Sequence, residues 1–403
     1  MIYRIEIENF YSVRERQIID LTVGKKVPEE PGRLVTLHDN TDLRAPRVAA
    51  LYGANASGKS NILRAIAFLS YFIRFSFESP SGRGLPYLKF NTRDMVKKPT
   101  ILSISFAGFE NPNSIGNSRT CPYVYRLELS PILDESNKVL RESLHYRPRA
   151  SSRLVKILER DAEKNVKVAS WVGVGRERSV LKRILRPDAS VICTLAQLDN
   201  KLAQQFIKSA AAVYTNILIG RLESSDHDIA KEYRKDEKLL SKLNRDVQRL
   251  DLGVNKVFIE TQRGPPKARF DHAGLDGPIN MNLESHGTQQ FVRIYPTLCR
   301  ALEQGGIAII DELDAAIHPT ILPEILRWFC DNDRNPHGAQ LWMSCHSVSL
   351  LDVLLKEEVL ICEKSPSAAT KVYKLAAIKG IRRSENYQRL YLGGVYGGVP
   401  IIG

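Results

Sequence analysis

The sequence contains no apolar run that approaches the ~18 residues of a membrane-spanning helix. Its beginning, MIYRIEIENFYS, also lacks the features of a secretory signal peptide. Ile2, Ile5 and Ile7 stand among charged neighbours there, which indicates a strand. These absences predict a cytoplasmic protein.

Closely spaced cysteines are missing as well. There is no C-x-x-C pair, and no histidines cluster at ligand spacing. This pattern predicts reduced thiols in the core or on the surface, with no metal–thiolate site. The six cysteines are Cys121, Cys193, Cys299, Cys330, Cys345 and Cys362.

Acidic residues are outnumbered, 45 against 58 lysines and arginines, which gives a formal net charge of +13. Such a surface attracts polyanions. Residues 141–190 hold thirteen basic residues against six acids, and this stretch is either a solvated face or a nucleic-acid surface. The thirteen are Arg141, Arg147, Arg149, Arg153, Lys156, Arg160, Lys164, Lys167, Arg176, Arg178, Lys182, Arg183 and Arg186.

One glycine-rich turn has a fixed spacing. After an apolar strand, Gly53-x-x-x-x-Gly58-Lys59-Ser60 fits G-x-x-x-x-G-K-[ST] at every fixed position. The glycines allow backbone angles at which N–H groups point toward phosphate oxygens. Lys59 supplies a charge to the β- and γ-phosphates, and Ser60 is placed to bind Mg²⁺. The predicted ATP-binding loop comprises Gly53, Ala54, Asn55, Ala56, Ser57, Gly58, Lys59, Ser60 and Asn61.

Two adjacent carboxylates end a second apolar strand. In GGIAIIDELDAAIHP, residues 305–319, the run Ile307 to Ile310 is followed by Asp311 and Glu312. Buried acids need a compensating partner. In P-loop folds such a strand is expected next to the P-loop strand, so Asp311 would hold Mg²⁺ opposite Ser60. Glu312 would point to the other side of the chain and polarise the attacking water.

Three further stretches resemble the ABC/SMC ATPases. Ser285 and Gly287 head a predicted helix that resembles the signature helix, whose Ser and Gly contact the γ-phosphate held by the opposite protomer; a plain capped helix is the alternative. Asp314 resembles the D-loop residue that faces the dimer partner, whereas His318 replaces an aspartate and its role stays open. His346 resembles the switch histidine at the γ-phosphate, with an ordinary core or surface histidine as the alternative.

Larger segments are similar to the stand-alone AAA-type ATPases of bacterial phage-defence and abortive-infection operons (RloA-, AbiL- and AriA-like proteins). The similar segments are IENFYSV, LYGANASGKSNIL, SVICTLAQLDNKLAQQFI and the tail from NPHGAQLWMSCHS to GVPIIG. The resemblance spans most of the chain and is most specific at residues 281–402. The resemblance implies an ABC-like head with an inserted helical region, head-to-head dimers or higher homo-oligomers, and a separately encoded effector, often a nuclease.

The expected fold is α/β: a P-loop NTPase with an ABC/SMC-like head, built of a mixed central sheet and an antiparallel β-layer, with an inserted mainly helical region. Alternation in MIYRIEIENF, PTILSISFAGF and YVYRLELS predicts the β-layer. The predicted divisions are residues 1–134 for the first part of the head, 135–255 for a compact helical insertion, and 256–403 for the rest of the head. The final YLGGVYGGVP is either a packing or a docking segment.

Two functions stay open from the sequence. One is an ATPase whose nucleotide-gated dimer controls an effector in anti-phage defence. The other is a RecF-type repair or recombination ATPase that binds DNA itself. The ~220 residues between the P-loop helix and the signature disfavour a transporter subunit, because they are enough for another domain.

Overall fold

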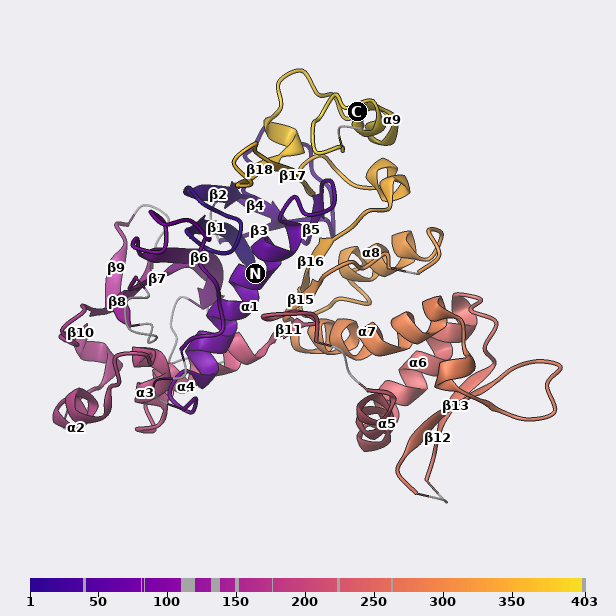
Figure 1. Ribbon diagram of the computed structural model, residues 1–403, viewed down its shortest axis with the longest axis horizontal. Coiled ribbons are helices and arrows are strands. Elements are labelled where there is room, and N and C mark those ends of the chain that lie inside the picture. Colours follow the sequence, from indigo (N-terminus) through magenta and orange to yellow (C-terminus); the bar gives the residue numbers. More distant parts are fainter. Residues whose placement is uncertain are drawn as a thin grey trace.

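The computed structural model describes residues 1–38, 41–80, 82, 84–109, 120–131, 138–148, 152–175, 177–222, 225–261, 264–315 and 317–400. In these ranges the chain forms two large sheets with helices between and beside them (Figure 1). Each helix in these ranges is too short or too polar to cross a membrane.

A six-stranded sheet with the order β11-β15-β16-β5-β17-β18 forms the centre. Its neighbouring strands are parallel except for the antiparallel pair β17 and β18. Side chains alternate between two hydrophobic cores, so that Leu51 joins one core and Ala50 and Tyr52 join the other. The strands are β5 (Val48–Tyr52), β11 (Val213–Thr215), β15 (Ile307–Ile310), β16 (Gln340–Ser344), β17 (Val359–Lys364) and β18 (Thr370–Lys374).

The strand that ends in the acidic pair does not lie next to the P-loop strand, so that prediction is wrong. Strand β16 lies between β15 and β5 and pairs in parallel with both. All five residues of β16 are buried, as a strand covered on both faces requires. Between the P-loop strand and the acidic strand therefore lies the strand that leads to His346.

A seven-stranded antiparallel sheet with the order β10-β9-β8-β7-β6-β1-β2 forms the second layer, and the three strands predicted for it are confirmed. The buried side chain of Gln340 joins the two sheets, because it bonds both the N–H and the carbonyl of Ile2 at 2.9 Å. The strands are β1 (Ile2–Glu8), β2 (Gln17–Asp20), β6 (Thr100–Phe109), β7 (Thr120–Leu129), β8 (Val139–Tyr146), β9 (Val155–Arg160) and β10 (Val166–Val168). A separate small sheet pairs β3 (Leu34–Thr36) with β4 (Arg44–Pro46).

Helix α1 (Lys59–Phe75) begins at the P-loop and packs in the core shared with the antiparallel sheet. Helices α7 (His286–Gln304) and α8 (Leu322–Cys330) pack in the other core, on the opposite face of the central sheet. The C-terminal part adds α9 (Tyr387–Leu392) and the short 3-10 helices η3 (Val348–Asp352) and η4 (Leu375–Ala377).

Residues 135–255 are not one compact helical insertion. Strands β8 to β10 extend the antiparallel sheet, and β11 enters the central sheet between two helical groups. Helices α2 (Glu177–Ile184), α3 (Val191–Ala196) and α4 (Lys201–Ala211), preceded by η1 (Ser170–Val172), lie on the α1 side. Helices α5 (Asp226–Lys235) and α6 (Glu237–Arg249) lie on the α7 side, with β12 (Lys256–Glu260), β13 (Lys267–Asp271), β14 (Ile279–Asn280) and η2 (Met281–Leu283).

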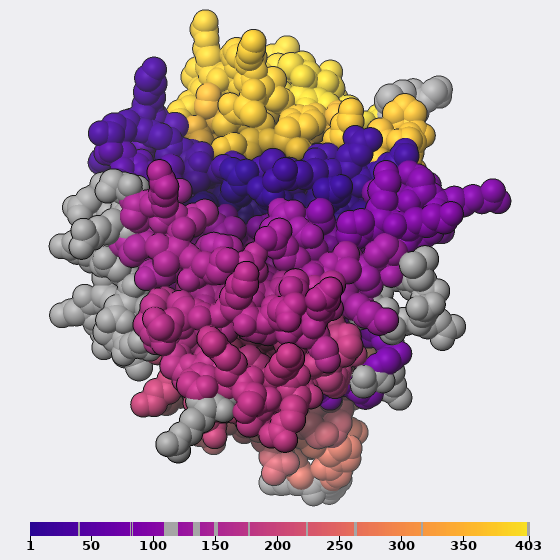
Figure 2. Space-filling view, turned by 90° about the vertical axis from the view of Figure 1, so that its left-hand side faces the viewer, coloured from indigo at the N-terminus to yellow at the C-terminus, as the bar shows by residue number. Residues whose placement is uncertain are grey.

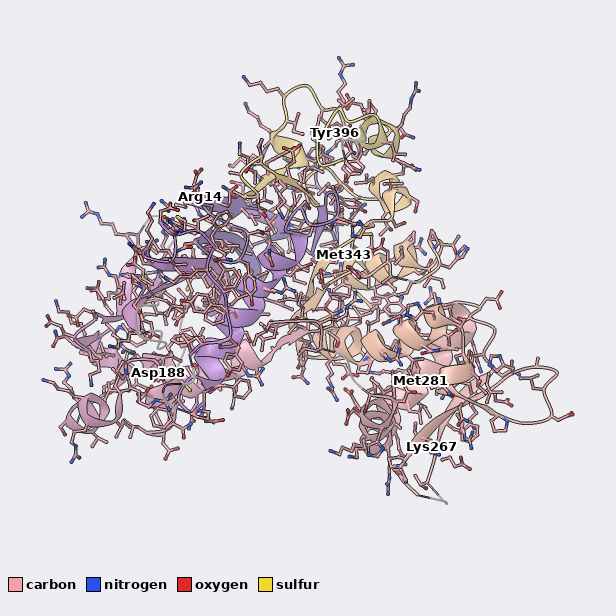
Figure 3. All side chains as sticks on the ribbon, in the orientation of Figure 1. Arg14, Asp188, Lys267, Met281, Met343 and Tyr396 are labelled. Atoms are coloured by element: carbon pink, nitrogen blue, oxygen red, sulfur yellow. The ribbon has the colours of Figure 1, made fainter. Side chains whose placement is uncertain are left out.

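The two groups stand far apart. Asp188 and Lys267, labelled in Figure 3, lie at opposite sides of the molecule, with Met343 of β16 between them. In the described part of residues 177–249 the helical composition is confirmed apart from β11, whereas residues 139–146, 155–160 and 166–168 are strands. The domain boundaries stay a prediction.

The basic stretch is divided between interior and surface. Arg160 is fully buried and donates to the carbonyls of Arg186 and Ala189. Arg186 in turn donates to the carbonyls of Ser76, Phe77 and Ser79, so two of the thirteen cations hold the fold together. Arg149 and Arg176 lie outside the described residues.

Figure 2 shows that this part of the chain, in magenta, covers much of one face of the molecule. Several other cations of the stretch are exposed. They are Arg153, Lys167, Arg178, Lys182 and Arg183.

The glycine- and aromatic-rich C-terminal segment packs against β17. Tyr396 is buried, and the N–H of Gly398 donates to Glu363 Oε1 at 2.9 Å. Leu392 and Val395 remain more than half exposed. No disulfide joins the cysteines, and burial raises the pKa of the Cys362 thiol, beside the P-loop, to about 12.

Candidate functional site

The glycine-rich loop follows the buried strand β5 directly and is packed too closely for side chains at its two fixed glycines. Gly53 has φ 153°, and a β-carbon there would lie 2.3 Å from the carbonyl oxygen of Cys362. Gly58 has φ 103°, and a β-carbon there would lie 2.0 Å from Thr370 Oγ1. Both positions therefore require glycine, which confirms the physical reason for the motif.

Residues from two distant segments support the loop from outside. Thr370, the first residue of β18, donates its hydroxyl to the carbonyl of Ser57 at 2.8 Å and lies 2.7 Å from Ser12 Oγ. Asn61 donates to the same Ser12 hydroxyl at 2.6 Å and accepts from Arg64 at 2.6 Å. Asn61 thus contacts neighbouring side chains, and its predicted nucleotide contact stays a prediction.

The interior of the loop holds polar groups suited to an anion. Lys59 is 5% exposed and donates to the carbonyls of Gly53 at 2.8 Å and Ala54 at 3.1 Å. Burial lowers the pKa of its ammonium group below the ordinary value. Ser57 Oγ is buried without a hydrogen-bond partner among the described residues, which a phosphate oxygen would supply.

The tip of the loop is open to solvent. Asn55 and Ala56 are exposed, and Ala56 has φ 60° although it is not a glycine. Backbone strain of this kind concentrates at functional sites. A loop of this kind at the N-terminus of a helix is suited to binding phosphate.

The acidic pair meets the P-loop across the intervening strand. Asp311, 6% exposed, accepts hydrogen bonds at Oδ1 from Ser60 Oγ at 2.9 Å and from Ser344 Oγ at 2.6 Å. Ser344 Oγ also accepts from the N–H of Glu312 at 2.7 Å. The predicted Mg²⁺ ligands Ser60 and Asp311 are thus in contact, and a hydroxyl plus a carboxylate is the oxygen donor set that this ion takes beside phosphate.

Glu312 is much more exposed than Asp311 and has different hydrogen-bond partners. It has φ 53°, and its side chain is 44% exposed. Arg221 Nη2 donates to Glu312 Oε2 at 2.8 Å and to the carbonyl of Asp311 at 3.2 Å. Asn216 forms a pair of hydrogen bonds with the Asp311 backbone, accepting from its N–H at 2.8 Å and donating to its carbonyl at 3.1 Å.

Three residues at this edge, Ser344, Asn216 and Arg221, are not predicted from the sequence. Ser344 ends β16, and the carboxyl ends of parallel strands meet at one edge, so its position carried a usable signal. Asn216 and Arg221 follow β11, which has only three residues and lies within a region predicted to be helical. That strand is too short for its pattern to be recognised.

His346 follows β16 and has an exposed side chain. Asp314 Oδ2 accepts from the N–H groups of His346 at 2.8 Å and Ser347 at 2.5 Å, so this carboxylate fixes the histidine's backbone within the same chain. His318 Nδ1 lies 2.8 Å from Thr320 Oγ1, a local contact. The predicted dimer contact of Asp314 stays a prediction.

Ser285 is the N-cap of α7, as predicted, and its hydroxyl accepts from the N–H of Thr288 at 3.1 Å. Ser285 is exposed and Gly287 half-buried. Because α7 packs on the face of the sheet opposite α1, the structure does not bring these two residues onto the chain's own P-loop.

A histidine–carboxylate pair lies directly before this cap. His272 Nε2 is 2.5 Å from Oε1 of the buried Glu284, and Nδ1 is 2.7 Å from the carbonyl of Gly253. The hydrogen bond to Glu284 raises the pKa of His272. The contacts of His272 join the end of β13 and the residues after α6 to the start of α7.

Comparison with known proteins agrees with this ATPase fold. A family model described as "AAA domain, putative AbiEii toxin, Type IV TA system" matches residues 48–120 and 176–352, more than half of the chain. The unmatched interval contains β8, β9 and β10 of the antiparallel sheet. No curated protein matches the chain in sequence.

Solved structures with a similar arrangement include SMC head domains. An SMC head bound to the C-terminal winged-helix domain of ScpA is 13% identical, with a TM-score of 0.47 over 92% of this chain and 97% of that chain. The SMC head of Thermotoga maritima is 12% identical, with a TM-score of 0.40 over 93% and 98%. A head with an extended coiled coil, bound to the C-terminal domain of ScpA from Pyrococcus furiosus, is 12% identical, with a TM-score of 0.45 over 92% and 95%.

The His272–Glu284 pair predicts a pH-dependent stability. A raised pKa means that the pair stabilises the fold fully below the unfolded pKa of about 6.5, and that this contribution is lost as pH rises through the folded pKa. We expect His272→Gln and Glu284→Gln each to lower the melting temperature more at about pH 5.5 than at about pH 8.5. The double variant should lose little more than either single variant at low pH. A coupling between the two residues that is equal at both pH values would contradict this account.

Proposed function

We propose that this chain, which belongs to the AbiEii-related AAA family, binds ATP with Mg²⁺ and hydrolyses it, and that two copies act as the nucleotide-gated unit of an anti-phage defence complex in the cytoplasm. The observation that carries the proposal is the contact of Ser60 and Ser344 with one oxygen of Asp311, with Glu312 beside them. This contact joins the proposed phosphate-binding loop to the end of the strand that carries the proposed general base.

Binding is assigned to the loop. The ammonium of Lys59 would exchange the carbonyls of Gly53 and Ala54 for β- and γ-phosphate oxygens, and the buried Ser57 hydroxyl would donate to the same anion. Ser60 and Asp311 would hold Mg²⁺, which supplies positive charge to the phosphates when bound.

Hydrolysis is assigned to Glu312. Its carboxylate would accept a proton from a water whose oxygen attacks the γ-phosphorus, while the bond from that phosphorus to the bridging oxygen of ADP breaks. The exposed His346, whose backbone Asp314 fixes, is the predicted contact to the γ-phosphate. The products are ADP, phosphate and a proton that Glu312 returns to solvent.

A second copy would complete the site. Ser285 and Gly287 lie at the end of α7 remote from β15, and a helix of 19 residues spans about 28 Å. Their position across the sheet from α1 supports a role at the partner's γ-phosphate. ATP bound between two chains then contributes directly to dimer stability.

The defence role rests on the resemblance to phage-defence ATPases and on the family description, which names a toxin–antitoxin system. We propose that the dimer controls a separately encoded effector, such as a nuclease. Leu392 and Val395 of the C-terminal segment are more than half exposed, which supports an interaction with the effector there. This segment contacts β17 beside the P-loop strand.

A RecF-type function in which the chain binds DNA itself is the second candidate. The cations that remain exposed on α2 and β10 favour it. The burial of Arg160 and the bonds of Arg186 to backbone carbonyls weigh against reading the whole stretch as a nucleic-acid surface.

Glu312→Gln should separate binding from chemistry. The amide keeps the shape of the side chain and loses the proton acceptor, so we expect turnover to fall by roughly 10²-fold or more with ATP affinity retained. Lys59→Ala is the matched comparison and should lose ATP affinity itself, as calorimetry would measure. Wild-type turnover in Glu312→Gln would assign the base elsewhere, and tight ATP binding by Lys59→Ala would remove the P-loop assignment.

Mixing two inactive variants should restore activity if the site is shared. In a dimer of one Lys59→Ala chain and one Ser285→Arg chain, one site carries both lesions and the other carries neither. We expect partial recovery of ATP turnover on mixing, with mixed dimers verified by native mass spectrometry. An absence of recovery in the presence of mixed dimers would count against the shared site.

Charge reversal on α2 tests the DNA-binding candidate. Changing Arg178, Lys182 and Arg183 to Glu should weaken DNA binding and flatten the dependence of the binding constant on salt by about 1 per lost phosphate contact. An unchanged salt slope would leave α2 as a solvated face. The matched control reverses three exposed cations on α5, at the other side of the central sheet: Lys231, Arg234 and Lys235.

A further inference from the structure

We propose that Arg221 restrains the general base: it holds Oε2 of Glu312 in an ion pair that must open before this oxygen can accept a proton. The inference rests on the proposed function, because it takes Glu312 as the base. The restraint lowers the rate of hydrolysis. It comes from the loop after β11, which belongs neither to the P-loop nor to the strand that ends in the acidic pair.

The loop that carries Arg221 is fixed to the catalytic edge at its start. Asn216 follows β11 and bonds both the N–H and the carbonyl of Asp311. The N–H of Leu222 donates back to the carbonyl of Asn216 at 2.7 Å, which closes the loop. Arg221 is thereby delivered to the base from a strand on the far side of β15 from the P-loop.

One nitrogen of the guanidinium makes both contacts. Arg221 Nη2 is 2.8 Å from Glu312 Oε2 and 3.2 Å from the carbonyl oxygen of Asp311. The left-handed backbone of Glu312, with φ 53°, and the hydrogen bond from its N–H to Ser344 fix the origin of the side chain. Backbone and side chain together direct this carboxylate to the arginine.

This partner opposes the chemistry of a base. A side chain that assists a general base by orienting it leaves the accepting atom of the base available. Its interaction with the base strengthens as the base gains positive charge. Arg221 does the reverse, because its guanidinium already donates to Oε2, and a water can reach that oxygen only after this contact is broken. Proton transfer to Oε2 therefore requires the pair to open.

The pair is also weak enough to open. The two side chains are 35% and 44% exposed, and ion pairs in contact with water contribute little net stability. An ion pair of this strength lowers the rate of ATP hydrolysis without abolishing it. The restraint is a bias against hydrolysis in the resting chain.

Removal of the arginine should raise turnover. We expect Arg221→Ala to increase the basal kcat for ATP roughly 2–5-fold, the factor that an exposed ion pair can supply, with KM for ATP unchanged. Arg221→Lys keeps a charge but not the planar fork and should give a smaller increase. The double variant Arg221→Ala, Glu312→Gln should be as inactive as Glu312→Gln alone, because the gain acts through the base.

The control is an arginine–glutamate pair of similar exposure outside the site. Arg126 and Glu128 on β7 are 2.9 Å apart, with side chains 33% and 22% exposed, and Arg126→Ala should leave kcat unchanged. Melting temperatures of all variants verify folding. A fall in kcat, or no change, in both folded Arg221 variants would overturn the restraint. Undiminished turnover in Glu312→Gln would instead overturn the base assignment, so the two failures are distinguishable.

Discussion

One carboxylate oxygen connects the parts of the proposed active site. Asp311 Oδ1 accepts from Ser60, 251 residues earlier in the chain, and from Ser344, 33 residues later. The first hydroxyl belongs to the start of α1, and the second ends the strand between the P-loop and the acidic pair. Because Asp311 is buried, loss of either donor would leave a charged atom poorly compensated, so the P-loop, β15 and β16 are held in one register.

Asp311 Oδ1 also explains how the site forms although β16 separates β5 from β15. With β16 between β5 and β15, the acidic pair stands one strand further from the P-loop than the sequence analysis expects. The gap is bridged at the edge of the sheet, where a short hydroxyl from β16 and the first helical turn of α1 both reach the carboxylate. A larger side chain at position 344 would not fit among these buried neighbours.

Residues that act through local geometry could be predicted from the sequence. The glycines of the P-loop, the buried strand before Asp311 and the cap at Ser285 each depend on a few adjacent residues. Ser344, Asn216 and Arg221 depend on which strands become neighbours, and pairing between distant segments leaves little trace in one sequence. The prediction of a single compact insertion is wrong for the same reason. The three-residue strand β11 enters the central sheet, so α2–α4 and α5–α6 lie on opposite sides of it.

The position of β5 has a consequence for synthesis on the ribosome. Its two neighbours in the sheet, β16 and β17, begin at Gln340 and Val359, whereas β5 ends at Tyr52. At the usual pace of translation, a delay on the order of 15–60 s separates the emergence of these partners. During that time the apolar P-loop strand has no parallel neighbour and is exposed to misassociation. The antiparallel strands β1, β6 and β7 emerge much earlier, so they are suited to shelter α1 until the central sheet can close.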